Sequence, residues 1–138
     1  EIKPTPGAEA ETGRRVAREA ARLWRDTAVK PLLSSFRPDA LAAAQAAEPA
    51  LPRALLLDGW RPGWQDEART LGCVALVADY AILDPDAIER IHAAGMRALC
   101  YTVNDPATAR WLVGSGIDGI ITDAVDRFAP VDRLVIDQ

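Results

Sequence analysis

Polar residues follow several of the apolar segments of this 138-residue sequence and are the first candidates for a functional site. They are Ser34, Ser35, Asp58, Asp79, Asn104 and Asp123. When strands run parallel, the residues after their carboxyl ends gather at one edge, where barrel enzymes place their sites. Glu1 and Lys3 add a carboxylate and an ammonium at positions i and i+2, which share one face of a strand. Such a pair taken alone is most often a surface ion pair, so its meaning depends on its surroundings.

The elements that would position these residues alternate between short apolar segments and helices. The apolar segments cover residues 31–36, 54–58, 73–77, 96–103 and 115–123, and residues 1–3 read as the end of a further strand. Continuous apolar runs, in place of alternating ones, indicate strands covered on both faces and hence a parallel sheet of about six strands. The polar strand ends favour a (β/α)8 barrel over a doubly wound sheet. Six strands do not close an eight-stranded barrel, so the others would come from upstream sequence or another chain, unless the sheet is open.

Three helix starts can be placed from local signals. Residues 12–28 have Val16, Ala20, Leu23 and Trp24 at helical spacing, opposite several arginines that we assign to a solvated face. Asp84 and Asp105 each precede a proline, an arrangement typical of a helix N-cap followed by the first helical residue.

Composition excludes several classes of protein. A formal net charge of −4 argues against a nucleic-acid surface, which needs clustered Lys and Arg. Neither a Gly-x-Gly-x-x-Gly fingerprint nor a Gly-x-x-x-x-Gly-Lys-[Ser/Thr] loop occurs. No apolar run reaches the roughly 18 residues that a membrane span requires. Cys73 and Cys100 lie in apolar segments without a Cys-x-x-Cys spacing, which favours buried free thiols and fits a cytoplasmic protein.

Four motifs together resemble the glycerophosphodiester phosphodiesterase family, and they occur in family order. They are Glu1-Ile2-Lys3, Leu33-Ser34-Ser35-Phe36, Tyr101-Thr102-Val103-Asn104 and the segment from Gly116 to Asp123. The Thr-Val-Asn and Ile-Thr-Asp motifs favour this family over the related phospholipase type. The resemblance implies a TIM (β/α)8 barrel of the phospholipase-C-like phosphodiesterase type, with residues 1–138 as the C-terminal portion of a single barrel domain.

The resemblance also implies roles for individual residues. Glu1 would ligate a divalent cation, Mg²⁺ or Ca²⁺, and Lys3 would face the substrate phosphate. Ser35 and Phe36 would line the substrate pocket, and a purely structural cap of the strand end is the alternative. Tyr101 stands where the family usually has Trp, and it could still provide an amphipathic wall. Asn104 and Asp105 are interpreted as helix caps, and Asp123 as a helix cap or a site residue.

The family's catalytic histidines, carried by a His-Arg-Gly element and a His-Asp element, have no counterpart in this sequence, and neither does its Glu-x-Asp pair of metal ligands. The one histidine, His92, lies on a predicted helix and is interpreted as structural. We therefore expect the complete protein to hydrolyse glycerophosphodiesters to glycerol 3-phosphate and an alcohol, in glycerophospholipid metabolism, and this chain alone to be inactive. The alternative is a non-catalytic binding or regulatory module. A small-molecule partner is expected, while a homo-oligomer or contact with an N-terminal segment is left open.

Overall fold

The computed structural model describes residues 1–128 as alternating helices and parallel strands. The elements in chain order are α1 (Glu9–Leu23), β1 (Leu33–Ser35), α2 (Pro38–Ala47), β2 (Arg53–Leu57), α3 (Trp64–Thr70), β3 (Cys73–Asp79), the 3₁₀ helix η1 (Tyr80–Ile82), α4 (Pro85–Ala93), β4 (Arg97–Tyr101), α5 (Pro106–Gly114) and β5 (Gly119–Ile120). No helix in this part of the chain is long and apolar enough to cross a membrane.

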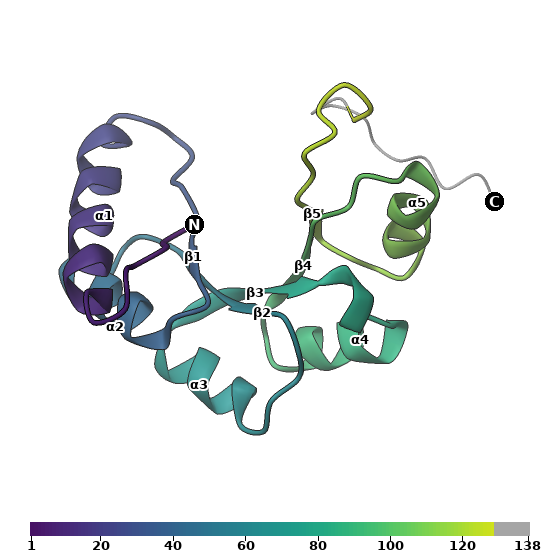
Figure 1. The fold of residues 1–138 in the computed structure, drawn as a ribbon, viewed down its shortest axis with the longest axis horizontal. Coiled ribbons are helices and arrows are strands. Elements are labelled where there is room, and N and C mark those ends of the chain that lie inside the picture. Colours follow the sequence, from purple (N-terminus) through teal and green to yellow (C-terminus); the bar gives the residue numbers. More distant parts are fainter. Residues whose placement is uncertain (129–138) are drawn as a thin grey trace.

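The five strands form one sheet in the order β1-β2-β3-β4-β5, and each neighbouring pair is parallel. Figure 1 shows the strands along the inside of a curve and the helices along its outside. This is the layering of a (β/α)8 barrel that covers only part of the circle, because five strands cannot close it. The predicted fold class, an incomplete parallel α/β barrel, is confirmed.

The segment Glu1 to Lys3 is not a strand, although we expected it to be the sixth. It nevertheless lies beside β1, because the Ile2 N–H donates to the Ser34 carbonyl at 2.7 Å. The side chain of Ile2 is 2% exposed and packs in a cluster between α1, α2 and β1. One main-chain bond holds the segment in line with β1 without making a regular ladder.

The sheet is apolar on both faces, as the continuous apolar runs predicted. One face carries Leu55, Leu57, Leu76, Ala98 and Cys100, which pack with residues of α3, α4 and α5 in the largest cluster. The inner face carries Ala54, Leu56, Ala75 and Val77, packed with Leu32, Leu99 and Tyr101. Because side chains alternate along a strand, β2, β3 and β4 each contribute to both clusters.

Helices α4 and α5 begin where the Asp-Pro signals predicted. The Asp84 side chain accepts from the Ala87 N–H at 2.7 Å, and the Asp105 side chain accepts from the Thr108 N–H at 2.8 Å. Each carboxylate satisfies an N–H that has no partner within its helix. These two caps fix where the chain turns from strand end to helix.

Helix α1 buries only part of the face that we predicted, since Val16 is partly buried against the same cluster as Ala20. Gly13, Ala17 and Ala20 are buried, whereas Leu23 and Trp24 are exposed. The reason is the close approach of α2: a Cβ added at Gly13 would lie 2.1 Å from the Ala40 carbonyl oxygen. Small residues permit this contact, and larger apolar residues of α1 lie outside it.

Arg53 is a buried cation that holds the loops at the amino ends of β2 and β3. Its guanidinium donates to the carbonyls of Leu51, Leu71, Pro49 and Gly72 at 2.6, 3.0, 3.3 and 3.4 Å, and the residue is 6% exposed. These bonds tie the chain before β2 to the α3–β3 turn.

We expect Arg53→Met to lower the free energy of unfolding by about 2 kcal/mol, because buried carbonyls lose a charged donor while the side-chain stem remains. Denaturant unfolding measures the change. Arg97→Met, which replaces an exposed arginine of β4, is the matched control and should change stability by less than about 0.5 kcal/mol. Equal effects of the two substitutions would contradict the assignment of a structural role to Arg53.

Candidate functional site

Glu1 and Lys3 lie on the opposite side of the first segment from Ile2. Ile2 points toward α1 and α2, so the alternation of side chains directs Glu1 and Lys3 toward the inner side of the sheet. The Lys3 ammonium is 3.3 Å from the Glu1 carboxylate, and their side chains are 77% and 32% exposed. The predicted pairing of the two residues on one face is therefore present, with both groups accessible.

Ser35 does not lie on this inner side, an arrangement that fits the structural alternative for this residue. It is fully buried and its hydroxyl donates to the Ile2 carbonyl at 2.8 Å, while the Arg37 N–H donates to the same oxygen at 3.1 Å. Since Leu33 and Ser35 share a face, Ser34 and Phe36 fall on the other. Ser35 therefore fixes the segment that carries Glu1 and Lys3.

Phe36 and Tyr101 form an aromatic wall across the carboxyl ends of β1 and β4. Their ring centroids are 5.8 Å apart and the rings meet edge to face. The Tyr101 hydroxyl donates to the carbonyl of Leu57, the last residue of β2, at 3.1 Å. The three strand ends are thus joined by side chains whose sequence positions are up to 65 residues apart.

Three carboxylates influence the Tyr101 hydroxyl. Burial is the main cause that raises the pKa of Tyr101 to about 12, and the charges of Asp79, Asp58 and Glu1 add to it. Asp79 pairs with Tyr101 in the register of β3 and β4, and Asp58 follows β2 directly. The carboxyl edge of the sheet is consequently acidic, and it holds Tyr101 as a neutral hydrogen-bond donor.

We expect Tyr101 to reduce stability above pH 10. Its folded-state pKa lies above the ordinary value of 10.0, so the unfolded chain loses this proton first and stability falls as the pH rises from 10 to about 12. Tyr101→Phe should remove this part of the fall in denaturant unfolding measured at pH 9 and pH 11. Tyr80→Phe is the control, and the two variants should differ in slope. Parallel pH profiles for wild type and Tyr101→Phe would contradict the raised pKa.

A hollow beside the aromatic wall was not predicted from the sequence. Its lining residues come from the carboxyl ends of β1 and β2 and the loops that follow, namely Phe36, Arg37, Leu56, Leu57, Asp58, Gly59 and Arg61. Arg37 pairs with Glu9 at 2.9 Å, and Arg61 pairs with Glu67. The two arginines lack any sequence signal beyond their position after a strand. Of their two ion pairs, only that of Arg37 with Glu9 joins residues distant in the chain.

His92 and Asn104 form hydrogen bonds that hold the segments around β4 and β5. His92 Nε2 lies 2.7 Å from the Asp118 carboxylate, which also accepts from the Ala98 N–H, so His92 has the structural role that we expected. Asn104 is not a helix cap: its side-chain oxygen accepts from the Thr122 hydroxyl and the Asp123 N–H. Within residues 1–128 no helix follows Asp123, so it is not seen as a helix cap there.

Glu1 is the residue that the family resemblance assigns to a metal ion. Within residues 1–128 there is no group of three or more His, Cys, Asp and Glu side chains arranged to hold an ion. Ca²⁺ and Mg²⁺ take six or more oxygen ligands, of which proteins usually supply several. The described residues therefore do not make a complete metal site.

The chain is a parallel α/β unit whose polar groups lie at the carboxyl edge of an open sheet. This arrangement is typical of part of a (β/α)8 barrel. The chain belongs to the glycerophosphoryl diester phosphodiesterase family, whose sequence profile matches residues 1–127. A search of curated proteins returned no match.

Solved structures of this kind share the fold. A phosphodiesterase from Oleispira antarctica, in complex with the product sn-glycerol-3-phosphate, is 27% identical, with a TM-score of 0.79 over 91% of this chain and 50% of that one. For a glycerophosphodiester phosphodiesterase from Parabacteroides distasonis the identity is 24% and the TM-score 0.68, over 86% and 50% of the two chains. The corresponding enzyme from Thermotoga maritima gives 22% and 0.65, over 83% and 52%. The chain thus spans about half the length of these structures.

Proposed function

We propose that this chain forms part of an enzyme that hydrolyses a glycerophosphodiester to glycerol 3-phosphate and an alcohol. Family membership supports the reaction class, and the Oleispira relative was solved with glycerol 3-phosphate as its product. The observation that carries the proposal to this chain is the position of Glu1, Lys3, Phe36 and Tyr101. The acidic and aromatic groups influence one another at the carboxyl edge, where barrel enzymes bind substrate.

Each residue has a role in this proposal. Lys3 places an exposed ammonium where it can neutralise phosphate charge, and Phe36 and Tyr101 provide an apolar wall with one fixed hydroxyl. Glu1 would contribute one ligand to Mg²⁺ or Ca²⁺, which when bound would polarise the phosphate oxygens. We propose that residues 1–138 are the C-terminal portion of one barrel domain. The remaining metal ligands and the catalytic histidines would come from outside these residues. A cytoplasmic location, supported by two free cysteines, belongs to the same proposal.

The test is hydrolysis by the full-length protein and by residues 1–138 alone, measured as glycerol 3-phosphate release with Mg²⁺, Ca²⁺ or a chelator. We expect metal-dependent activity from the full-length protein and none from the shorter chain. A full-length protein that binds glycerol 3-phosphate but hydrolyses no glycerophosphodiester would support the alternative, a non-catalytic binding module.

A further inference from the structure

An exposed apolar tip follows helix α1 and is not explained by the proposed site. We define the tip as residues 23–30. Within it Leu23 is 55%, Trp24 39% and Val29 78% exposed. Large apolar side chains scattered singly are ordinary on a surface, but three within seven residues make a patch.

The tip has a fixed local shape. The Lys30 ammonium donates to the carbonyls of Trp24 and Arg25 at 2.7 and 3.0 Å, at the carboxyl end of α1. The Thr27 hydroxyl lies 3.0 Å from the Trp24 carbonyl and 2.8 Å from that of Val29. These bonds bring Val29 and Lys30 back toward Trp24, so the apolar groups project from one compact turn.

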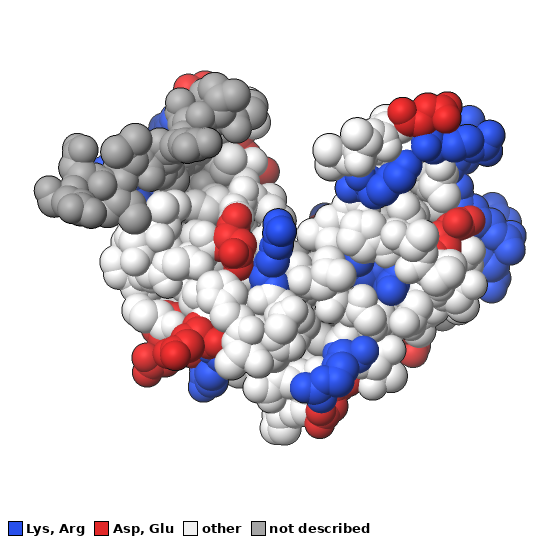
Figure 2. Space-filling view, turned by 180° about the vertical axis from the view of Figure 1, so that it is seen from behind, with Lys and Arg blue, Asp and Glu red and all other residues white. Residues whose placement is uncertain are grey.

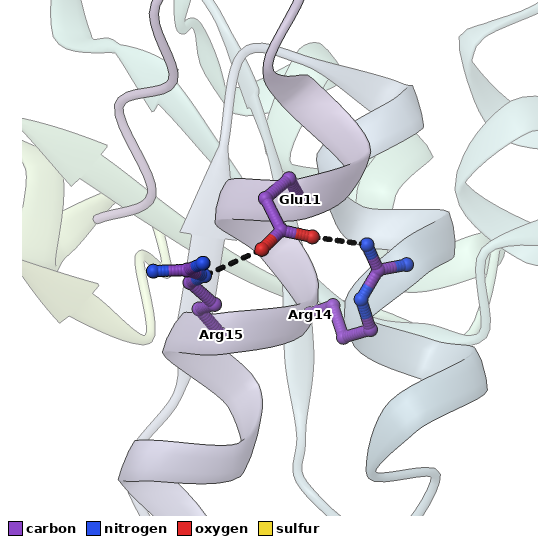
Figure 3. A network of polar contacts seen from close by, with 3 residues as sticks. All are labelled: Glu11, Arg14 and Arg15. Carbon is purple, nitrogen blue, oxygen red and sulfur yellow. Dashed lines mark hydrogen bonds and ion pairs between the residues drawn. The ribbon is translucent and has the colours of Figure 1, made fainter.

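The arginines on α1 are of two kinds. Arg14 and Arg15 both bind Glu11, as Figure 3 shows, and Arg22 binds Glu19 at 2.9 Å. Closer to the tip, Arg18 and Arg25 form no ion pair with any residue in the described part of the chain, and Lys30 bonds to carbonyls only.

The tip and the last turns of α1 are therefore positively charged. Between positions 18 and 30 there are four basic residues and two acidic ones, in a chain whose net charge is −4. Figure 2 shows Lys and Arg side chains gathered on the arm of the molecule that carries α1. The net charge of this segment is therefore positive, whereas the net charge of the whole chain is negative.

The tip is also distant from the candidate site. It leads into the amino end of β1, whereas Phe36 and Tyr101 lie at the carboxyl ends of their strands. A large partner could therefore contact the tip and leave the carboxyl edge of the sheet open.

We propose that this tip attaches the protein to the surface of an anionic phospholipid bilayer. Trp and Leu favour the interfacial region, where an apolar body is buried and polar groups stay hydrated. Basic residues beside them are attracted to anionic headgroups, each strengthening binding about fivefold. The combination of projecting apolar side chains with unpaired cations matches a lipid surface better than an apolar protein surface, which would leave those cations desolvated.

The experiment is sedimentation of the full-length protein with vesicles of phosphatidylcholine alone or with one quarter phosphatidylserine. We expect binding to the anionic vesicles, weakened by salt. Trp24→Ser should reduce it about tenfold, and Arg25→Gln about fivefold. Trp111→Ser and Arg110→Gln are the matched controls on α5, where Trp111 is 49% exposed, and they should bind like wild type.

Two results would overturn the proposal. One is vesicle binding that is absent or equally affected in tip and control variants. The other is a Trp24→Ser variant that changes oligomeric state or unfolding but not vesicle binding. In that case a second copy or another part of the protein would cover the tip. Hydrolysis of a soluble glycerophosphodiester should be unchanged by Trp24→Ser. A wild-type protein without hydrolysis that still binds vesicles would overturn only the proposed enzymatic function.

Discussion

Replacing Glu1 by glutamine should reduce hydrolysis by the full-length protein by two to three orders of magnitude. Glutamine keeps the shape of the side chain but loses the charge that a hard cation requires of its ligand. Removal of one preorganised charge from a reacting phosphate site costs roughly 3 to 4 kcal/mol in the transition state. The measurement is glycerol 3-phosphate release across a titration of Mg²⁺ or Ca²⁺, in which higher metal concentration should restore part of the rate.

Lys3→Met tests the proposed contact of Lys3 with phosphate separately from the proposed metal ligation by Glu1. Methionine keeps much of the lysine stem without the ammonium, so we expect a lower rate at saturating metal and an unchanged metal requirement. Glu89→Gln, at an exposed position of α4, is the control and should leave both quantities unchanged. Full activity of Glu1→Gln at low metal would show that Glu1 is not a ligand, and the first segment would then lose its place in the site.

Replacing Gly13 by alanine should lower the free energy of unfolding by about 3 kcal/mol. The added Cβ would lie 2.1 Å from the carbonyl oxygen and 2.9 Å from the carbonyl carbon of Ala40, which belong to the backbone of α2. Neither helix can relieve this contact by a side-chain rotation, so α1 and α2 must separate. Their separation would expose Ala17, Ala20, Ala40 and Ala44, which form the small cluster with Ile2.

Gly114→Ala in α5 is the matched control. A Cβ at Gly114 meets nothing within 4 Å, and alanine is the better helix former, so this variant should be neutral or up to about 1 kcal/mol more stable. Denaturant unfolding of both variants measures the difference. If Gly13→Ala were as stable as wild type, the close packing of α1 on α2 would be wrong.

The sequence predicted the architecture because the signals for strands and helix starts lie in neighbouring residues. Continuous apolar runs indicated a two-sided parallel sheet, and the Asp-Pro pairs at Asp84 and Asp105 indicated the starts of α4 and α5, as found. The motif containing Glu1 and Lys3 predicted two groups on one face, and the ion pair at 3.3 Å agrees. The assignment to the phosphodiesterase family rested on motif order and is confirmed over residues 1–127.

Which side of each element faces the site was decided only by the tertiary structure. Both faces of the sheet are apolar, so the sequence could not tell that Ser35 points toward the helices and Phe36 toward Tyr101. Gly13 and Ala17 of α1 are buried, while Leu23 and Trp24 are exposed, because helix α2 approaches α1 closely at Gly13. The sequence by itself determined the order and type of the elements, through local spacing and capping. Contacts between distant residues determined which side chains reach the carboxyl edge and which project from the tip, because burial depends on the neighbouring element.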